Sequence, residues 1–246
     1  MQNLNFESIR ITMNNKNLII TGADGALGRV VAAKLLSDGW TLHASVFDEK
    51  SKETLKNLFP DSLEKTIFPT ITDLSDEKDV QKFISGVNDI FGLVHLAGGY
   101  KGAKSVVDYS TGDFDFLMKL NTKPTFLLMK EIIPQLKKKN EGSIVVIGAK
   151  PVIHQTNENA LYTASKSAAV AITLSVAEEC REFNIRANCI LPATLQTKNN
   201  LSWASEEEFK TFTPLEDVAD IISFLMSEKS KGITGMTIPM YNKVEW

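Results

Sequence analysis

Short apolar runs rich in Ile and Val alternate with longer helical patterns along the chain, and this alternation constrains the fold more than any other feature. The runs occupy residues 17–21, 41–47, 65–71, 92–97, 143–149 and 185–191, with a seventh at 236–241. The helical patterns occupy 26–38, 76–88, 113–139, 160–183 and 215–227. Strands that alternate with helices form a parallel sheet covered on both faces. We predict an α/β fold with a doubly wound, Rossmann-like sheet of about seven strands and a ligand at their carboxyl ends.

The alternation runs without a linker, repeat or low-complexity segment, so we predict one domain over residues 17–246 after an N-terminal extension over 1–16. The extension lacks the continuous apolar core of a secretory signal. The longest uncharged apolar stretch lies between Lys166 and Glu178, well short of the ~20 residues that cross a bilayer. We expect no membrane-spanning segment.

Charge and cysteine content restrict the partners. With 27 Lys and Arg against 30 Asp and Glu, the chain has no positive excess for binding a phosphate backbone. Cys180 and Cys189 fall in a predicted helix and a predicted strand, which leaves nothing for a disulfide framework or a cysteine-based metal site. We expect a cytoplasmic protein that binds a small molecule, and no metal or nucleic acid.

The predicted helix at 160–183 is apolar or small on nearly every side over residues 167–177. One side can face the sheet, so something else must cover the other. A neighbouring subunit packed closely against Ala164, Ala168 and Ala171 would do so, and we expect a homo-oligomer. The alternative is a C-terminal segment of the same chain.

A glycine-rich turn, Thr21 to Gly28, joins the first predicted strand to a helix. Glycine lets backbone approach a pyrophosphate, and the helix N-terminus offers free N–H groups. Any strand-to-helix turn needs similar residues, so the motif alone leaves cofactor binding open. After the second strand, the acidic Asp48 would favour NAD(H) and the basic Lys50 would favour NADP(H). The choice between the two coenzymes therefore stays open.

Tyr162 and Lys166 begin the long helix and lie one turn apart on the same face. A nearby ammonium favours the phenolate, so Lys166 is expected to lower the pKa of Tyr162 and tune it for proton donation. An isolated pair with this spacing is usually an ordinary exposed pair. Its coincidence with the glycine turn points to one shared crevice.

Taken in order, these motifs resemble the short-chain dehydrogenase/reductase family over nearly the whole chain. The resemblance rests on the glycine turn, Asp73-Leu74, Leu96-Ala97-Gly98, Asn121, Tyr162 with Lys166, and the segment from Pro192 to Thr197. It implies Tyr162, Lys166 and Asn121 as catalytic residues, with Asn121 relaying protons. It also implies that the cofactor is bound by Gly22, Asp24, Ala26, Leu27, Gly28, Asp73, Leu74, Ala97, Gly98, Tyr162, Lys166, Pro192, Thr194 and Thr197.

The chain departs from the family at the residue that normally polarises a carbonyl. The family's serine stands thirteen residues before its tyrosine, a position occupied here by Ala149. Dihydropteridine reductases within the family resemble this chain in Gly148-Ala149-Lys150 and in Ala97-Gly98-Gly99 followed by an aromatic residue, Tyr100. A quinonoid ring is already electron-poor, so it can accept a hydride without that serine.

Three functions follow from these observations. The first is an NAD(P)-dependent reductase of a small electron-poor acceptor, quinonoid pterin-like or carbonyl, with Tyr162 as proton donor. The second is a non-catalytic dinucleotide-binding scaffold. The third is a carbonyl or 3-oxoacyl reductase in which another polar group, such as His154 or Thr156, replaces the serine.

The polar segment 196–212 is expected to form either a lid over the substrate or a surface helix anchored by Trp203. Tyr100, Lys101 and Lys150 are candidates for the same site, although lysines in such segments are more often solvated rim charges.

Overall fold

The computed structural model describes residues 16–244. Its strands are β1 (Asn17–Thr21), β2 (Thr41–Val46), β3 (Ile67–Ile71), β4 (Ile90–His95), β5 (Gly142–Ile147), β6 (Ile185–Pro192) and β7 (Thr237–Met240). Its α-helices are α1 (Ala26–Ser37), α2 (Glu49–Leu58), α3 (Glu77–Ser85), α4 (Thr111–Leu117), α5 (Lys123–Lys139), α6 (Ala160–Glu179), α7 (Lys198–Leu201), α8 (Glu206–Thr211) and α9 (Leu215–Met226). The expected extension lies outside the described residues except for Lys16.

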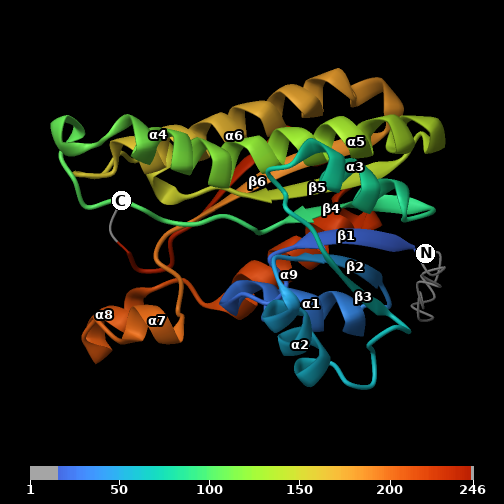
Figure 1. Cartoon of the computed structure of the whole chain (residues 1–246), viewed down its shortest axis with the longest axis horizontal. Coiled ribbons are helices and arrows are strands. Elements are labelled where there is room, and N and C mark those ends of the chain that lie inside the picture. The colour runs from blue at the N-terminus through green and yellow to red at the C-terminus, as the bar shows by residue number, and fades with distance from the viewer. Residues whose placement is uncertain (1–15, 245–246) are drawn as a thin grey trace, which may run out of the picture.

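The seven strands form one parallel sheet in the order β3-β2-β1-β4-β5-β6-β7 (Figure 1). This confirms the predicted doubly wound arrangement, in which the strand order reverses beside β1. The register pairs Thr21, the last residue of β1, with Ser45 of β2 and His95 of β4. The carboxyl ends of the central strands therefore meet at one edge of the sheet.

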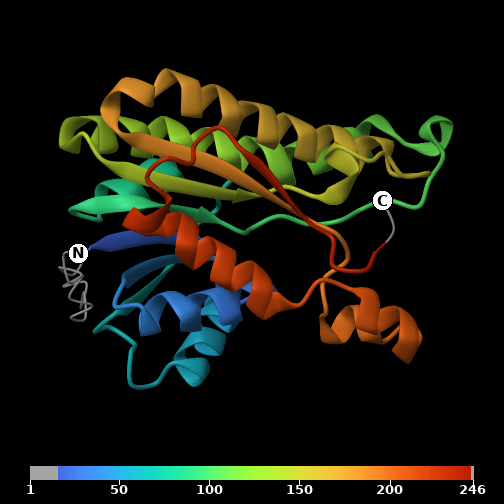
Figure 2. The same cartoon turned by 180° about the vertical axis from the view of Figure 1, so that it is seen from behind.

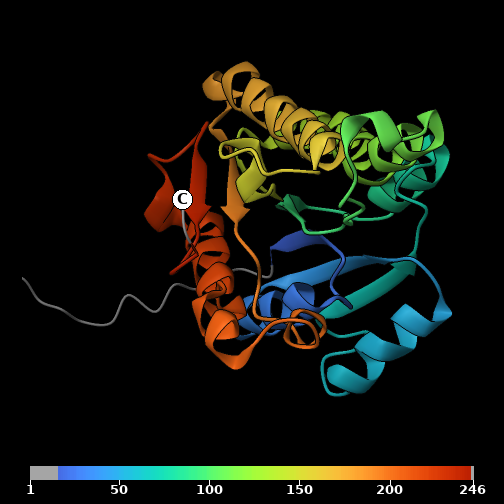
Figure 3. The same cartoon turned by 90° about the vertical axis from the view of Figure 1, so that its left-hand side faces the viewer.

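Helices cover both faces of the sheet. Figure 1 shows α3, α4, α5 and α6 on one side and α1, α2 and α9 on the other, and Figures 2 and 3 show the same layers from behind and from the end. Side chains of β1 alternate between the two layers: Leu18 and Ile20 belong to the core beneath α1 and α9, and Ile19 belongs to the core beneath α5 and α6. This period of two is what a strand buried on both faces produces.

The helices differ from the prediction in three places. Helix α2 was not predicted, because its ten residues contain only two apolar side chains, Leu55 and Leu58, of which Leu55 alone is buried. The helix expected at 113–139 is divided into α4 and α5 by a π-helical turn over Met118–Thr122. The helix expected at 160–183 ends at Glu179 and is followed by a 3₁₀ turn at Arg181–Phe183.

Helix α6 is long and apolar enough to cross a membrane by length and composition alone, a test that core helices of soluble proteins also pass. Here it packs on β6 and beside α5. Ala164 and Ala171 on its outer face are exposed, and Ala168 is half-buried. The alternative that the chain's own C-terminal segment covers this face was wrong for the described residues.

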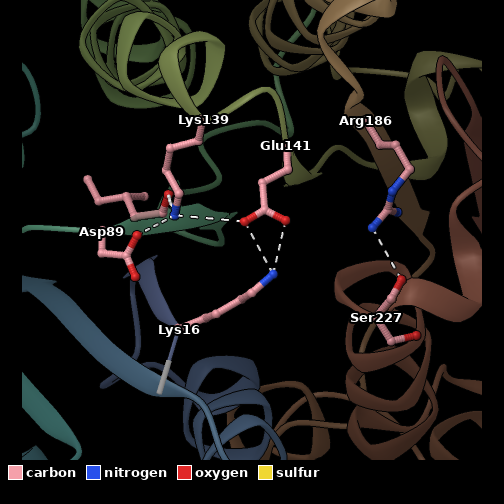
Figure 4. A network of polar contacts seen from close by, with 7 residues as sticks. Lys16, Asp89, Lys139, Glu141, Arg186 and Ser227 are labelled. Atoms are coloured by element: carbon pink, nitrogen blue, oxygen red, sulfur yellow. Dashed lines mark hydrogen bonds and ion pairs between the residues drawn. The ribbon is translucent and has the colours of Figure 1, made fainter. Parts of the chain in front are cut away.

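Charged groups gather at the opposite edge of the sheet, where strands begin. Lys16 before β1 binds Glu141 before β5, and Lys139 binds Asp89 before β4 (Figure 4). Further along that edge, the Arg186 guanidinium donates to the carbonyls of Leu225 and Ser227 at the end of α9. These charges tie the amino ends of the strands together and leave the carboxyl edge to the site.

Candidate active site

Two adjoining cavities lie at the carboxyl edge of the sheet, with volumes of about 680 and 710 Å³. Both are lined by Leu96 and Gly98, which directly follow β4, so we name them the first and second cavity of one crevice. Volumes of this size suit small ligands and cofactors. They lie beyond the strand ends, where the doubly wound arrangement predicts the ligand site.

The glycine turn forms one end of the first cavity. Gly22 has a φ of +68°, and a Cβ there would lie 3.0 Å from the amide nitrogen of Ala97. A Cβ on Gly28 would lie 1.9 Å from the carbonyl oxygen of Gly22, so α1 can pack against the turn only with glycine at this position. Gly22, Asp24, Ala97 and Gly98 line this cavity, whereas Ala26, Leu27 and Gly28 do not.

Helix α1 begins at Ala26 without a side-chain cap on its first N–H groups. Free N–H groups at a helix N-terminus attract phosphate. Ala26, Leu27 and Gly28 have their backbone N–H groups in this first turn of α1, so their predicted part in cofactor binding rests on the backbone.

A buried pair, Thr21 and His95, joins the glycine turn to the segment after β4. The Thr21 hydroxyl accepts hydrogen bonds from the amides of Leu96 and Ala97 at 3.2 and 3.1 Å and lies 2.7 Å from Nδ1 of His95. Burial lowers the pKa of His95 to about 3, so its ring is neutral. Because two amides already donate to the Thr21 oxygen, the hydroxyl donates its own hydrogen bond to Nδ1. We did not predict this pair, although its register is visible once β1 and β4 are paired.

The far end of the first cavity is apolar after β2, where an acidic or basic residue was expected to distinguish NAD(H) from NADP(H). Phe47 lines it and is 79% exposed. Asp48 does not line it, because its carboxylate accepts a hydrogen bond of 2.8 Å from the amide of Ser51 and caps α2. Asp73 does line the cavity, and hydrogen bonds from the Ser75 hydroxyl and amide lower the pKa of its carboxyl.

Tyr162 and Lys166 line the second cavity, as the sequence predicted. The Lys166 ammonium donates a 3.0 Å hydrogen bond to the carbonyl of Ile147, and burial lowers its pKa to about 8. Burial also raises the pKa of Tyr162 to about 12, with a smaller contribution from Tyr100. The expected lowering of the Tyr162 pKa by Lys166 was therefore wrong, because desolvation dominates. The phenol is protonated at neutral pH.

Asn121 lies in the π-helical turn beneath the crevice and lines neither cavity. Its amide oxygen accepts from the Gly99 amide at 2.9 Å, and its nitrogen donates to the Gly99 carbonyl and to the Ser165 hydroxyl, both at 3.0 Å. A Cβ on Gly98 would lie 2.7 Å from the same amide oxygen and 3.0 Å from the Lys166 nitrogen. Asn121 thus fixes the Gly98–Gly99 backbone beside Lys166.

Ala149 lines the second cavity together with Tyr162, so the missing serine hydroxyl would have faced the same space. Thr156 lines this cavity. His154 does not; its ring packs edge-on against Tyr241 with the ring centres 5.7 Å apart. The remaining predicted residues on this wall are Pro192, Thr194 and Thr197.

Two aromatic residues complete the second cavity. The ring of Tyr100 meets that of Tyr162 edge-on, with the ring centres 5.0 Å apart. Trp203, in the turn between α7 and α8, is 63% exposed and contacts Phe212 with the ring centres 5.6 Å apart. Lys101 is bound to Asp113 and does not line this cavity. Trp203 thus belongs to the cavity wall and also packs on its own segment.

The match to protein families agrees with this geometry. The model for short chain dehydrogenases matches residues 16–208. The chain belongs to the short-chain dehydrogenase family. It is 26% identical over 246 residues to dehydrogenase/reductase SDR family member 4 of Sus scrofa, over 93% of this chain and 87% of that protein.

Two further comparisons span as much of this short-chain dehydrogenase. It is 27% identical over 240 residues to the 3-oxoacyl-[acyl-carrier-protein] reductase of Thermotoga maritima, over 92% of this chain and 96% of the relative. The solved structure described as ElxO with NADP bound superposes with a TM-score of 0.85 at 24% identity, over 92% of this chain and 97% of that one. Membership of this family makes the chain an oxidoreductase.

Proposed function

We propose that this short-chain dehydrogenase reduces a small, flat, electron-poor acceptor such as a quinonoid dihydropterin. The observation that carries the proposal is Ala149, which lines the second cavity beside Tyr162 in place of a hydroxyl donor. A carbonyl that must be polarised needs such a donor. A ring that is already electron-poor needs only a hydride and a proton, and Tyr162 supplies the proton.

The residues of the first cavity fit a dinucleotide. The uncapped first turn of α1 and the close approach permitted by Gly22 suit a pyrophosphate. Asp24, Asp73, Leu74, Ala97 and Gly98 would line the adenosine side, while Lys166, Pro192, Thr194 and Thr197 would face the nicotinamide end. When bound, NAD(P)H supplies the hydride.

Tyr162 and Lys166 have different tasks in this proposal. The Tyr162 phenol is protonated at neutral pH, which is the form that a reduction requires, and a pKa of about 12 keeps it so. Lys166 is held on the Ile147 carbonyl and retains two ammonium protons for the cofactor ribose or for Tyr162. Asn121 supports both by fixing Gly99.

Ala149→Ser provides the first test of the proposal. We expect the wild type to oxidise NADH or NADPH with a quinonoid dihydropterin and to show little activity on simple ketones. Ala149→Ser should gain ketone activity, because the new hydroxyl can donate to the negative charge that develops on a ketone oxygen in the transition state, and it should lose part of its pterin activity. No change on either acceptor would count against the proposal.

A second candidate, a carbonyl or 3-oxoacyl reductase, is favoured by the Thr156 hydroxyl in the cavity and by the activity named for the Thermotoga maritima relative. In that case Thr156→Val should abolish ketone reduction. The third candidate, a scaffold, would bind NAD(P)H with no turnover of any acceptor. Retention of both Tyr162 and Lys166 favours an enzyme.

A further inference from the structure

Tyr100 and Asn159 form a hydrogen-bonded pair in the wall of the second cavity, and both residues line it. Tyr100 follows β4 and Asn159 directly precedes α6, so the pair bridges two loops. Its hydrogen bond, from the Tyr100 hydroxyl to the Asn159 amide oxygen, is 2.8 Å long. The Tyr100 ring is 61% exposed while its edge contact to Tyr162 places it beside the proton donor.

The orientation of the Asn159 amide decides what the Tyr100 hydroxyl can do. The amide nitrogen donates to the Asn157 carbonyl at 2.9 Å and to the Thr156 hydroxyl at 3.0 Å. A carbonyl can only accept, so the nitrogen must face Asn157 and the amide oxygen must face Tyr100. The Tyr100 proton is therefore committed to Asn159.

A phenol oxygen that donates its proton still has lone pairs. Over residues 16–244 no side chain or amide donates to the Tyr100 oxygen. Gly102 packs behind the pair, since a Cβ there would lie 2.3 Å from both the Tyr100 oxygen and the Asn159 oxygen. Tyr100 consequently offers a hydrogen-bond acceptor to the cavity, and it is no substitute for the missing serine donor.

We propose that Tyr100 and Asn159 form a specificity pair that selects acceptors bearing an N–H or O–H group beside the reducible ring. The inference deepens the proposed function and rests on it. A dihydropterin carries such N–H groups on its ring and its exocyclic amine, whereas a quinone or simple ketone carries none. The pair would therefore favour dihydropterins over quinones and simple ketones by one hydrogen bond.

Tyr100→Phe tests the pair because it removes the hydroxyl and keeps the ring. The measurement is kcat and KM for a quinonoid dihydropterin and for unsubstituted 1,4-naphthoquinone, which is flat and has no donor. One lost neutral hydrogen bond corresponds to roughly a 3- to 10-fold rise in KM for the pterin. The KM for naphthoquinone, which has no donor for the Tyr100 oxygen, should rise less than the KM for the pterin.

The chain offers a matched control in Tyr109→Phe. The Tyr109 hydroxyl also bridges the two loops, by a 3.2 Å bond to the Glu158 carbonyl, but Tyr109 does not line the second cavity. This variant should leave both KM values unchanged. Equal effects of the two variants, or equal effects of Tyr100→Phe on the two acceptors, would overturn the specificity pair and leave only loop packing.

Two further variants change the pair without removing Tyr100. Gly102→Ala should separate the Tyr100 hydroxyl from Asn159, so it should change the KM values in the same direction as Asn159→Ala does. Asn159→Ala should free the hydroxyl to donate, so the KM for naphthoquinone should fall, a change of sign that loop damage would not produce. Asn159 makes no side-chain cap to α6, so the helix keeps its start. An unchanged or higher naphthoquinone KM would contradict the proposal.

Equilibrium binding separates failure of the pair from failure of the proposed function. If the wild type reduces neither acceptor, the proposed function fails. Binding of a stable 7,8-dihydropterin and of naphthoquinone to the coenzyme complex, followed by fluorescence, then tests the pair alone. A 3- to 10-fold weaker pterin affinity confined to Tyr100→Phe would support it, and equal affinities, or no pterin binding to the wild type, would overturn it.

Discussion

Lys166 and Tyr162 share a cavity wall, and burial changes both groups in opposite directions. The pKa of Lys166 falls to about 8 while that of Tyr162 rises to about 12. Each shift disfavours the charged form, which is the effect of desolvation. The sequence predicted the pair and its place in the site, but it contained no information on burial, so it gave the wrong direction for Tyr162.

The buried Lys166 ammonium should cost stability in the free protein. Its pKa of about 8 lies below the ordinary 10.5, so between these values the unfolded chain binds more protons than the folded one and the free energy of unfolding rises with pH. Below pH 8 the full cost remains. Lys166→Met should therefore raise the free energy of unfolding at pH 7 by roughly 1 to 2 kcal/mol, after loss of one hydrogen bond.

Urea unfolding of both proteins between pH 7 and 10.5 measures this cost. The advantage of Lys166→Met should shrink as the pH rises above 8 and reverse before the upper end of the window, where only the lost hydrogen bond to Ile147 remains. Parallel pH dependence of the two proteins would contradict the assigned pKa.

At the scale of elements, the sequence predicted what periodicity encodes and missed what long-range contacts impose. All seven strands were predicted because buried parallel strands are continuous apolar runs. The π-helical turn at Met118–Thr122 was not predicted. The Asn121 side chain in this turn binds Gly99, which lies 22 residues away in the sequence. No local sequence pattern predicts such a long-range contact or the π-helical turn that accompanies it.

The end of α9 provides a prediction at this scale. The Leu225 carbonyl accepts from the Arg186 guanidinium at 2.6 Å and from the Ser143 hydroxyl at 2.8 Å. Arg186→Met would remove the charge-assisted hydrogen bonds that the largely buried guanidinium donates to the Leu225 and Ser227 carbonyls, at a cost of about 2 to 4 kcal/mol. Arg181→Met, which removes an exposed ion pair with Glu178, is the control and should cost less than about 0.5 kcal/mol. Similar losses in both variants by thermal unfolding would contradict the role of Arg186.

At the scale of the whole molecule, the sheet edge brings residues from six strand ends into one crevice. The order of motifs along the chain was enough to predict most of that convergence, since parallel strands all end on the same side. The wall formed by Tyr100 and Trp203 is different, because loop conformation decides which side chains face the cavity. Sequence could name both residues but could not place them.

Our expectation of a homo-oligomer rests on the exposed small residues of α6. Close packing of a second copy on this face would not tolerate a long charged side chain at Ala171. Ala171→Arg should reduce the molar mass measured by light scattering to that of one chain, and Ala171→Ser should leave it unchanged. A monomeric wild type, or an Ala171→Arg variant of the same mass as the wild type, would contradict the expectation.

The central claim is that the Tyr162 phenol supplies the proton beside a coenzyme bound on the glycine turn. The most direct measurement compares wild type and Tyr162→Phe for coenzyme affinity and for transfer of deuterium from NAD(P)H labelled at the nicotinamide C4 to a quinonoid dihydropterin. We predict that both proteins bind the coenzyme with equal affinity and that the variant transfers deuterium at least about 100-fold more slowly. A variant within a few-fold of the wild-type rate, or a wild type that binds neither NADH nor NADPH, would contradict the account.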